Sequence, residues 1–101
     1  MNIGIIGSGN VGSVLGKGWA RRGHKVVFSY SRDRQKLERL AAAAGPNARA
    51  GTPAEAAQFG EVVVLATPWG AVEDALQAAG SLAGKVLVDC TNPLKADFSG
   101  L

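Results

Sequence analysis

The stretch Ile3-Gly4-Ile5-Ile6-Gly7-Ser8-Gly9-Asn10-Val11-Gly12 decides the fold of this 101-residue chain. An apolar run leads directly into glycines spaced as Gly-x-Gly-x-x-Gly, and a helical pattern follows without a break. In that strand–turn–helix context the motif is typical of a dinucleotide-binding turn. Gly7 permits the tight turn, Gly9 lets the backbone approach a pyrophosphate, and Gly12 lets the helix pack close to the sheet. A glycine turn with a purely structural role is the alternative.

The helix after this turn supplies the groups that a phosphate needs. The N–H groups of its first turn are free, and the positive end of the helix dipole faces the same side. We therefore expect the pyrophosphate of a dinucleotide to be bound by the residues of the turn, which are Gly7, Ser8, Gly9, Asn10, Val11 and Gly12.

The composition fits one small domain spanning residues 1–101 with a single core. The hydrophobic content of 47% is ordinary for a globular protein. No apolar stretch approaches the roughly 20 residues of a membrane helix, and the N-terminus lacks the basic lead of a signal peptide. One cysteine, Cys90, leaves no internal disulfide and no metal-ligand cluster. We therefore expect a cytoplasmic protein with no membrane attachment and no bound metal.

The net charge of +3 hides a division between the two halves of the chain. Residues 1–50 hold nine Lys and Arg against two acids, a net +7, whereas residues 51–101 hold two Lys against six acids, a net −4. The basic half contains the glycine turn, so its field favours an anionic ligand. Nucleic acid is the competing partner, but the basic residues alternate with apolar positions and lack interleaved aromatic residues for base stacking. We expect no nucleic-acid binding.

Strands and helices are predicted in alternation along the whole chain. The expected strands cover about 3–6, 25–29, 48–50, 61–66 and 85–90, and the expected helices cover about 10–22, 33–44, 53–59 and a segment after residue 70 that ends near 79. Residues 62–66 are all apolar, as in a parallel strand buried on both faces. Short connections between these elements predict an α/β, Rossmann-type, doubly wound sheet of five parallel strands in the order 3-2-1-4-5.

Local patterns add detail to two of the helices. In the first, 3.6-residue spacing places Val11, Val14, Leu15 and Trp19 on the inner face. Gly12 and Gly16 should present a strip without side chains to the sheet. Gly18 is expected to mark another position where the helix lies close to a neighbouring element. The sequence Thr52-Pro53-Ala54-Glu55 is a capping box that begins a short helix.

The end of the second strand decides the cofactor. An NAD site usually places an acid there to accept from the ribose 2′-OH, but this chain reads Phe28-Ser29-Tyr30-Ser31-Arg32-Asp33-Arg34. Asp33 is better placed to cap the next helix. Hydroxyl and guanidinium groups suit a 2′-phosphate, so we predict NADP(H), with the phosphate ligands drawn from Ser29, Ser31, Arg32 and Arg34. A solvated basic turn is the alternative.

Two further turns are expected at the same edge of the sheet. Ala66-Thr67-Pro68-Trp69 follows the fourth strand, where ligands of doubly wound sheets bind, and we expect it to line the nicotinamide end. Thr67 and Pro68 serving only as helix-start residues is the alternative. Asn92 and Pro93 lie in the turn after the fifth strand. Cys90 is interpreted as a small buried residue, because no His or Asp is spaced to activate it.

These turns together resemble those of the coenzyme F420-dependent NADP oxidoreductases. The resemblance rests on residues 7–12, Ser31-Arg32, residues 66–69 and Asp89-Cys90-Thr91-Asn92-Pro93-Leu94, and it covers essentially the whole chain. The glycine motif alone would not separate this family from pyrroline-5-carboxylate reductases or related dehydrogenases. The resemblance implies hydride transfer between NADP(H) and a deazaflavin, coenzyme F420, or a flavin-like acceptor. It places Ser31 and Arg32 at the 2′-phosphate, Ser8, Asn10 and Val11 at the pyrophosphate, and Thr67, Pro68 and Trp69 on the nicotinamide side. Ala66, Asn92 and Pro93, which lie in the same turns, are also expected to bind the cofactor.

The chain departs from the family pattern in two ways. Tyr30 makes the turn after the second strand one residue longer than the usual form. The longer turn leaves open which residue binds the phosphate, and the candidates are Ser29, Ser31, Arg32 and Arg34. The family also has a C-terminal portion that completes the deazaflavin pocket and a homodimer, and nothing here corresponds to it. No catalytic acid or base is expected, because hydride transfer between ring cofactors needs none. A non-catalytic NADP-binding or redox-sensing module is the alternative function.

Overall fold

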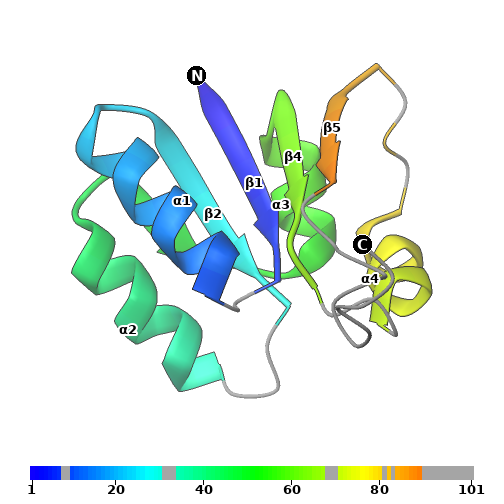
Figure 1. Cartoon of the computed structure of the whole chain (residues 1–101), viewed down its shortest axis with the longest axis horizontal. Coiled ribbons are helices and arrows are strands. Elements are labelled where there is room, and N and C mark those ends of the chain that lie inside the picture. Colours follow the sequence, from blue (N-terminus) through cyan, green and yellow to red (C-terminus); the bar gives the residue numbers. More distant parts are fainter. Residues whose placement is uncertain (8–9, 31–33, 68–70, 81, 83, 90–101) are drawn as a thin grey trace, which may run out of the picture.

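The computed structural model describes residues 1–7, 10–30, 34–67, 71–80, 82 and 84–89. Within them strands and helices alternate from β1 to β5 (Figure 1). The strands are β1 (Asn2–Ile6), β2 (Lys25–Ser29), β3 (Ala48–Ala50), β4 (Val62–Leu65) and β5 (Val86–Asp89). The helices are α1 (Asn10–Arg21), α2 (Arg34–Ala44), α3 (Pro53–Phe59) and α4 (Val72–Ala79). Each expected element is present, and its bounds lie within a few residues of the prediction.

The five strands form one parallel sheet in the order β3-β2-β1-β4-β5. This confirms the predicted fold class and strand order. Strand β1 is central, and its Ile5 lies opposite Phe28 of β2 and Val64 of β4. The central position agrees with its composition, because Ile3–Ile6 are apolar or glycine, as is typical of a strand with a helix layer on each face.

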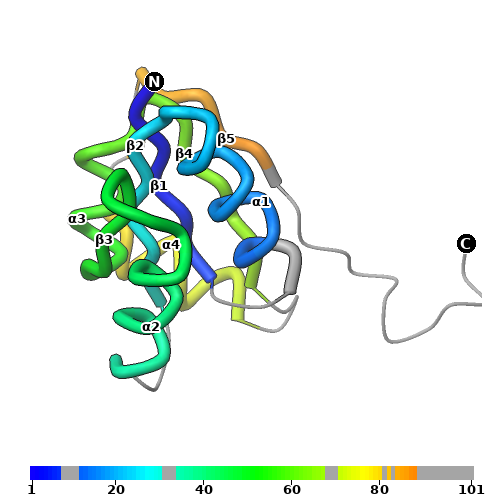
Figure 2. Tube along the Cα trace, turned by 90° about the vertical axis from the view of Figure 1, so that its left-hand side faces the viewer, coloured from blue at the N-terminus to red at the C-terminus, as the bar shows by residue number. Residues whose placement is uncertain are grey.

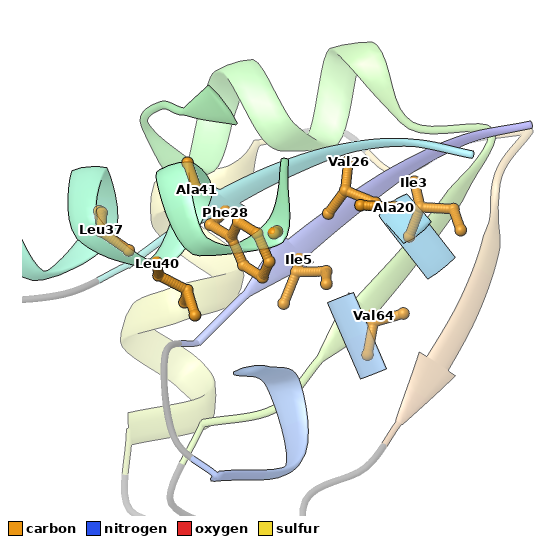
Figure 3. Packing of buried hydrophobic residues seen from close by; sticks show 10 residues of the cluster. Ile3, Ile5, Ala20, Val26, Phe28, Leu37, Leu40, Ala41 and Val64 are labelled. Carbon is orange, nitrogen blue, oxygen red and sulfur yellow. The ribbon is translucent and has the colours of Figure 1, made fainter. Parts of the chain in front are cut away.

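The helices cover the two faces of the sheet in pairs (Figures 1 and 2). Helices α1 and α2 lie on one face, over a buried cluster in which Phe28, Ile5 and Val64 meet side chains of α2 (Figure 3). Helices α3 and α4 lie on the other face, where their alanines pack against Ile6, Val27, Val63 and Leu65. In the part of the chain that the structure describes, no helix is long and apolar enough to span a bilayer.

The inner face of α1 differs from the expected one. Val14 is 70% exposed, and a Cβ added to Gly18 would meet nothing within 4 Å, so both of those predictions are wrong. Among the α1 residues whose burial the structure describes, the buried ones are Gly12, Gly16 and Ala20, spaced four apart, and the predicted inner residue Trp19 is partly buried against the same cluster. A Cβ on Gly16 would lie 2.2 Å from the Phe28 ring. The helix therefore packs on the sheet through its smallest residues, which turns Val14 to solvent, and the predicted Gly12–Gly16 strip is confirmed.

The predicted capping box at the start of α3 is also confirmed. The Glu55 N–H donates to the Thr52 hydroxyl at 3.1 Å, and the Thr52 N–H donates to Glu55 Oε1 at 2.9 Å. These bonds satisfy two of the backbone donors that a helix N-terminus leaves unpaired. The Thr52 N–H, then the Thr52 hydroxyl, and less strongly the charges of Arg49 and Arg34, hold the pKa of the Glu55 carboxyl below its ordinary value of 4.5.

This lowered pKa predicts a pH-dependent contribution of Glu55 to stability. Because the folded-state pKa lies below the unfolded value, the contribution is complete above about pH 4.5 and is lost as the pH falls through the folded-state pKa. Glu55→Ala should therefore lower the melting temperature at pH 7, and its gap to the wild type should close in acid. Thermal melts followed by circular dichroism across this range check it. A gap that stays constant down to the lowest pH would contradict the assignment.

Candidate dinucleotide site

The site is positioned by the change in winding direction between β1 and β4. The chain leaves β1 towards α1 on one face of the sheet, and it leaves β4 towards α4 on the opposite face (Figure 1). The two connections therefore diverge above the carboxyl ends of neighbouring strands. In doubly wound sheets this divergence opens a crevice for ligands. The described residues that follow β1, β2 and β4 at this edge are Gly7, Tyr30 and Ala66–Thr67, each at the start of a predicted turn.

Gly7 joins the ends of the three central strands. Its φ is +123°, which side-chain-bearing residues rarely adopt, and a Cβ there would lie 2.5 Å from the Ala66 carbonyl carbon. The Gly7 N–H donates to the Ser29 carbonyl at 3.0 Å, and the Ala66 N–H donates to the Ile6 carbonyl at 2.8 Å. Any larger residue would push β1 and β4 apart at this point.

Gly12 then holds the first turn of α1 against this junction. A Cβ on Gly12 would lie 2.8 Å from the Gly7 carbonyl oxygen and 3.2 Å from the Ala66 side chain. The helix begins at Asn10, so the N–H groups of its first turn lie at the carboxyl edge of β1 and close to the end of β4. A helix N-terminus that begins three residues after Gly7 is the kind of backbone feature at which phosphates bind in other proteins.

Thr67 contributes a polar atom without a partner. Its side chain is only 5% exposed, and its hydroxyl has no hydrogen-bond partner among the residues that the structure describes. Leaving a buried hydroxyl unpaired costs about 1–3 kcal/mol, so such a group calls for an explanation, of which a bound ligand is one. Thr67 also lies beside the glycine turn, because a Cβ on Gly7 would be 2.9 Å from the Thr67 N. The orphaned hydroxyl therefore lies where a cofactor would cross from β1 to β4.

Ser29 has a different environment from the expected one. Its side chain is fully buried, and its hydroxyl donates to the Ile5 carbonyl at 2.7 Å. A hydroxyl proton held inside the sheet is not free for a phosphate, which argues against Ser29 as a ligand and gives it a structural role at the β1–β2 junction. Its position in the sequence predicted a phosphate ligand, because a polar side chain at the end of a strand often points towards the loop that follows.

Arg34 is placed where a phosphate ligand could reach it. It is the first residue of α2, directly after the connection from β2, and its side chain is 62% exposed. Its Nε lies 3.8 Å from Glu38 Oε1 one helical turn away. An exposed pair at that distance contributes little, so the guanidinium can turn to a stronger anion at small cost.

Tyr30 makes a contact that no sequence pattern indicated. Its hydroxyl donates to Asp74 Oδ2 of α4 at 2.8 Å, across 44 positions of sequence. Its φ is +67°, the one positive φ of a residue other than glycine in the described part of the chain. The sequence analysis singled out Tyr30 only for the length of its turn, and no sequence pattern related it to Asp74.

The other predicted site residues lie outside the described residues. For Asn10 and Val11 the structure describes the helical backbone and not the side chains. The predicted residues without a described position are Ser8, Gly9, Ser31, Arg32, Asp33, Pro68, Trp69, Cys90, Asn92 and Pro93. Their assignments remain predictions. Helix α4 is preceded by Ala71, which makes no side-chain cap, so the described residues lend no support to a capping role for Thr67.

Comparison with known proteins gives a consistent picture. The family model described as NADP oxidoreductase, coenzyme F420-dependent, matches residues 2–93. A crystal structure described as an F420-dependent NADP reductase from Arthrobacter sp. FB24 is similar with a TM-score of 0.80 and 33% identity over 92% of this chain and 46% of its own. A hypothetical protein from Sinorhizobium meliloti gives a TM-score of 0.78 and 25% identity over 100% of this chain and 52% of its own.

A more distant structure shares the fold alone. An imine reductase from Bacillus cereus gives a TM-score of 0.73 and 24% identity over 90% of this chain and 32% of its own. No curated protein sequence matches the chain. The chain thus spans about half the length of the first two solved structures and about a third of the third.

Proposed function

The chain belongs to the family of coenzyme F420-dependent NADP oxidoreductases, and we propose that it is an NADP-binding domain for hydride transfer between NADP(H) and a deazaflavin or flavin-like acceptor. The observation that carries the proposal is the junction of Gly7, Gly12 and Thr67. It combines a glycine turn, a helix N-terminus and a buried hydroxyl that has no hydrogen-bond partner among the described residues. A structural turn would explain the glycines but not the orphaned hydroxyl.

The pyrophosphate would be bound by the turn after β1. Gly7 and Gly12 bring the start of α1 against the sheet, and Ser8, Gly9, Asn10 and Val11 would supply N–H groups to the phosphate oxygens. The net +7 of residues 1–50 raises the local concentration of a polyanionic ligand at this edge.

The 2′-phosphate would be bound by the connection from β2 to α2. Ser31 and Arg32 are the ligands that the family resemblance implies, and the exposed Arg34 can join them. Ser29 is left out because its hydroxyl donates to Ile5. Two guanidinium groups would favour the phosphate-bearing cofactor over NADH.

The nicotinamide would lie over the ends of β4 and β5, beside Ala66, Thr67, Pro68 and Trp69, with Asn92 and Pro93 from the turn after β5. A carboxamide or ribose hydroxyl of the cofactor would give the Thr67 hydroxyl the partner that it lacks in the described residues. When bound, NADP(H) supplies the hydride chemistry, and the protein orients the ring and excludes water. Full reduction of the acceptor by NADPH also takes up one proton, which solvent can supply without a protein acid.

NADPH should bind at least about tenfold more tightly than NADH, a difference of roughly 1.4 kcal/mol. Charge-assisted bonds to the 2′-phosphate supply this difference, and solvent and salt screen it, because the turn is at the surface. Arg32→Ala should remove most of the preference and leave NADH affinity almost unchanged. Fluorescence titration with both cofactors at low and moderate salt measures it.

Arg21→Ala is the matched control for this experiment. It removes the same charge from the far end of α1, at the amino edge of the sheet, so the preference should persist. Equal or tighter binding of NADH to the wild type would refute the assignment to NADP. In that case Asp33 would be the residue to test as an acceptor for the ribose 2′-OH.

Turnover decides between an oxidoreductase and a binding module. The chain is incubated with NADPH and either coenzyme F420 or a flavin, and oxidation is followed by the loss of reduced-nicotinamide absorbance. Oxidation that depends on both the protein and the acceptor supports hydride transfer. Retained NADPH binding without turnover would favour a non-catalytic or redox-sensing module instead.

A further inference from the structure

The backbone of Tyr30 is held in an unusual conformation directly after β2. Its φ of +67° lies in the left-handed region, which a bulky side chain rarely occupies. Such a conformation persists only where the surroundings fix it, and it is concentrated at functional sites.

Contacts on both sides of Tyr30 hold it in place. Before it, the Ser29 hydroxyl donates to Ile5, and the Ser29 carbonyl accepts from the Gly7 N–H at 3.0 Å. On the side-chain side, the Tyr30 hydroxyl donates to Asp74 Oδ2 at 2.8 Å, and the ring packs against the buried cluster that includes Ala75 of α4. The hydrogen bond and the ring contact thus connect the end of β2 to helix α4, on the face of the sheet that α3 and α4 cover.

We propose that Tyr30 and Asp74 form a clasp that determines the selectivity for the 2′-phosphate. In this assignment Tyr30 is a positioning residue, because it directs the following chain and the start of α2 towards the phosphate. The inference rests on the proposed function, since it presupposes that a 2′-phosphate is bound after β2. Without the bond to Asp74 the left-handed conformation of Tyr30 is held less firmly, and the position of Arg34, the first residue of α2, is less well fixed.

The charge of Asp74 makes the inference sharply testable. Asp74 lies in the first turn of α4, where the helix dipole stabilises a negative charge. The same charge would repel a phosphate bound at this edge of the sheet. Simple electrostatics therefore predicts that removing Asp74 strengthens NADPH binding. The clasp predicts the opposite, because removing Asp74 takes away the carboxylate that accepts from the Tyr30 hydroxyl.

The experiment compares NADPH and NADH affinities of the full chain by fluorescence titration. Tyr30→Phe keeps the ring and removes the hydrogen bond, and Asp74→Ala removes the acceptor. Each should lower the NADPH-to-NADH preference about fivefold, the loss expected for one net hydrogen bond. The double variant should lose no more than either single variant, because both break the same bond. Asp74→Asn should keep most of the preference, since its amide oxygen can still accept from Tyr30.

Glu73→Ala is the matched control, because it removes an equal charge from the neighbouring exposed position of α4. It should leave the preference unchanged or slightly raised. The clasp is refuted if Asp74→Ala behaves like Glu73→Ala, or if Tyr30→Phe keeps the wild-type preference. Wild-type protein that binds neither cofactor would instead refute the proposed function. Circular dichroism and retained NADH affinity verify that each variant is folded.

Discussion

Gly4→Ala is expected to destabilise the domain by at least about 3 kcal/mol, although it adds a single methyl group to an apolar strand. A Cβ at Gly4 would lie 2.0 Å from the Ala56 carbonyl oxygen and 2.6 Å from its carbonyl carbon. Both atoms belong to the backbone of α3, so no side-chain rotation relieves the overlap. Helix and strand would have to separate along the centre of the sheet. Thermal and urea unfolding followed by circular dichroism measure the loss.

Gly18→Ala provides the matched control, with the same substitution where the added methyl group meets nothing within 4 Å. Because Gly18 lies on the exposed side of α1, alanine should raise stability by up to about 1 kcal/mol through helix propensity. We therefore expect Gly4→Ala to lower the free energy of unfolding and Gly18→Ala to raise it. A small effect of Gly4→Ala would show that α3 does not lie on β1 as closely as described.

The contrast between these two glycines shows where sequence reasoning succeeds and where it fails. The alternation of apolar strands and periodic helices was sufficient to predict the five-stranded sheet and its order, because few topologies satisfy right-handed crossovers with short connections. The prediction for α1 was less accurate. Periodicity selected Val14 for the core, but Val14 is exposed, whereas the strip of Gly12 and Gly16 predicted from their spacing is buried. Hydrophobicity alone does not reveal how near two backbones lie.

The edge strand β5 illustrates a related limit. Its apolar residues predicted a strand, and the structure has one, but Val86, Leu87 and Val88 remain 61%, 45% and 39% exposed. A run of Val and Leu indicates that a segment favours a strand and that its side chains favour burial. Whether the strand is covered depends on its neighbours in space, which the local pattern does not contain.

The candidate site shows the same division. Gly7 and Gly12 were predictable because the dinucleotide motif encodes a local turn, and both adopt the close packing expected of it. Ser29 was assigned to the ligand from its position, but its hydroxyl donates across the sheet to Ile5. The contact between Tyr30 and Asp74 joins residues 44 positions apart, and no spacing rule relates them. Contacts between distant segments require the fold itself.

Gly9→Val should weaken the binding of NADPH and NADH alike by at least about a hundredfold, because its side chain would occupy the space of the pyrophosphate common to both cofactors. This distinguishes it from Arg32→Ala, which should affect NADPH alone. The fold should survive, since the contacts that pack α1 on the sheet are made by Gly12 and Gly16. Titration of both cofactors measures the loss, and the melting temperature reports the fold.

Gly18→Val is the control for Gly9→Val, because it adds the same side chain to an exposed position of the adjoining helix and should leave both affinities unchanged. If Gly9→Val binds both cofactors as tightly as the wild type, the pyrophosphate does not lie on this turn and the site assignment fails. If only NADPH binding falls, the substitution acts through the 2′-phosphate turn, and the glycine motif is not the pyrophosphate site. A parallel loss of both cofactors in a folded variant is the result that a dinucleotide crossing the end of β1 requires.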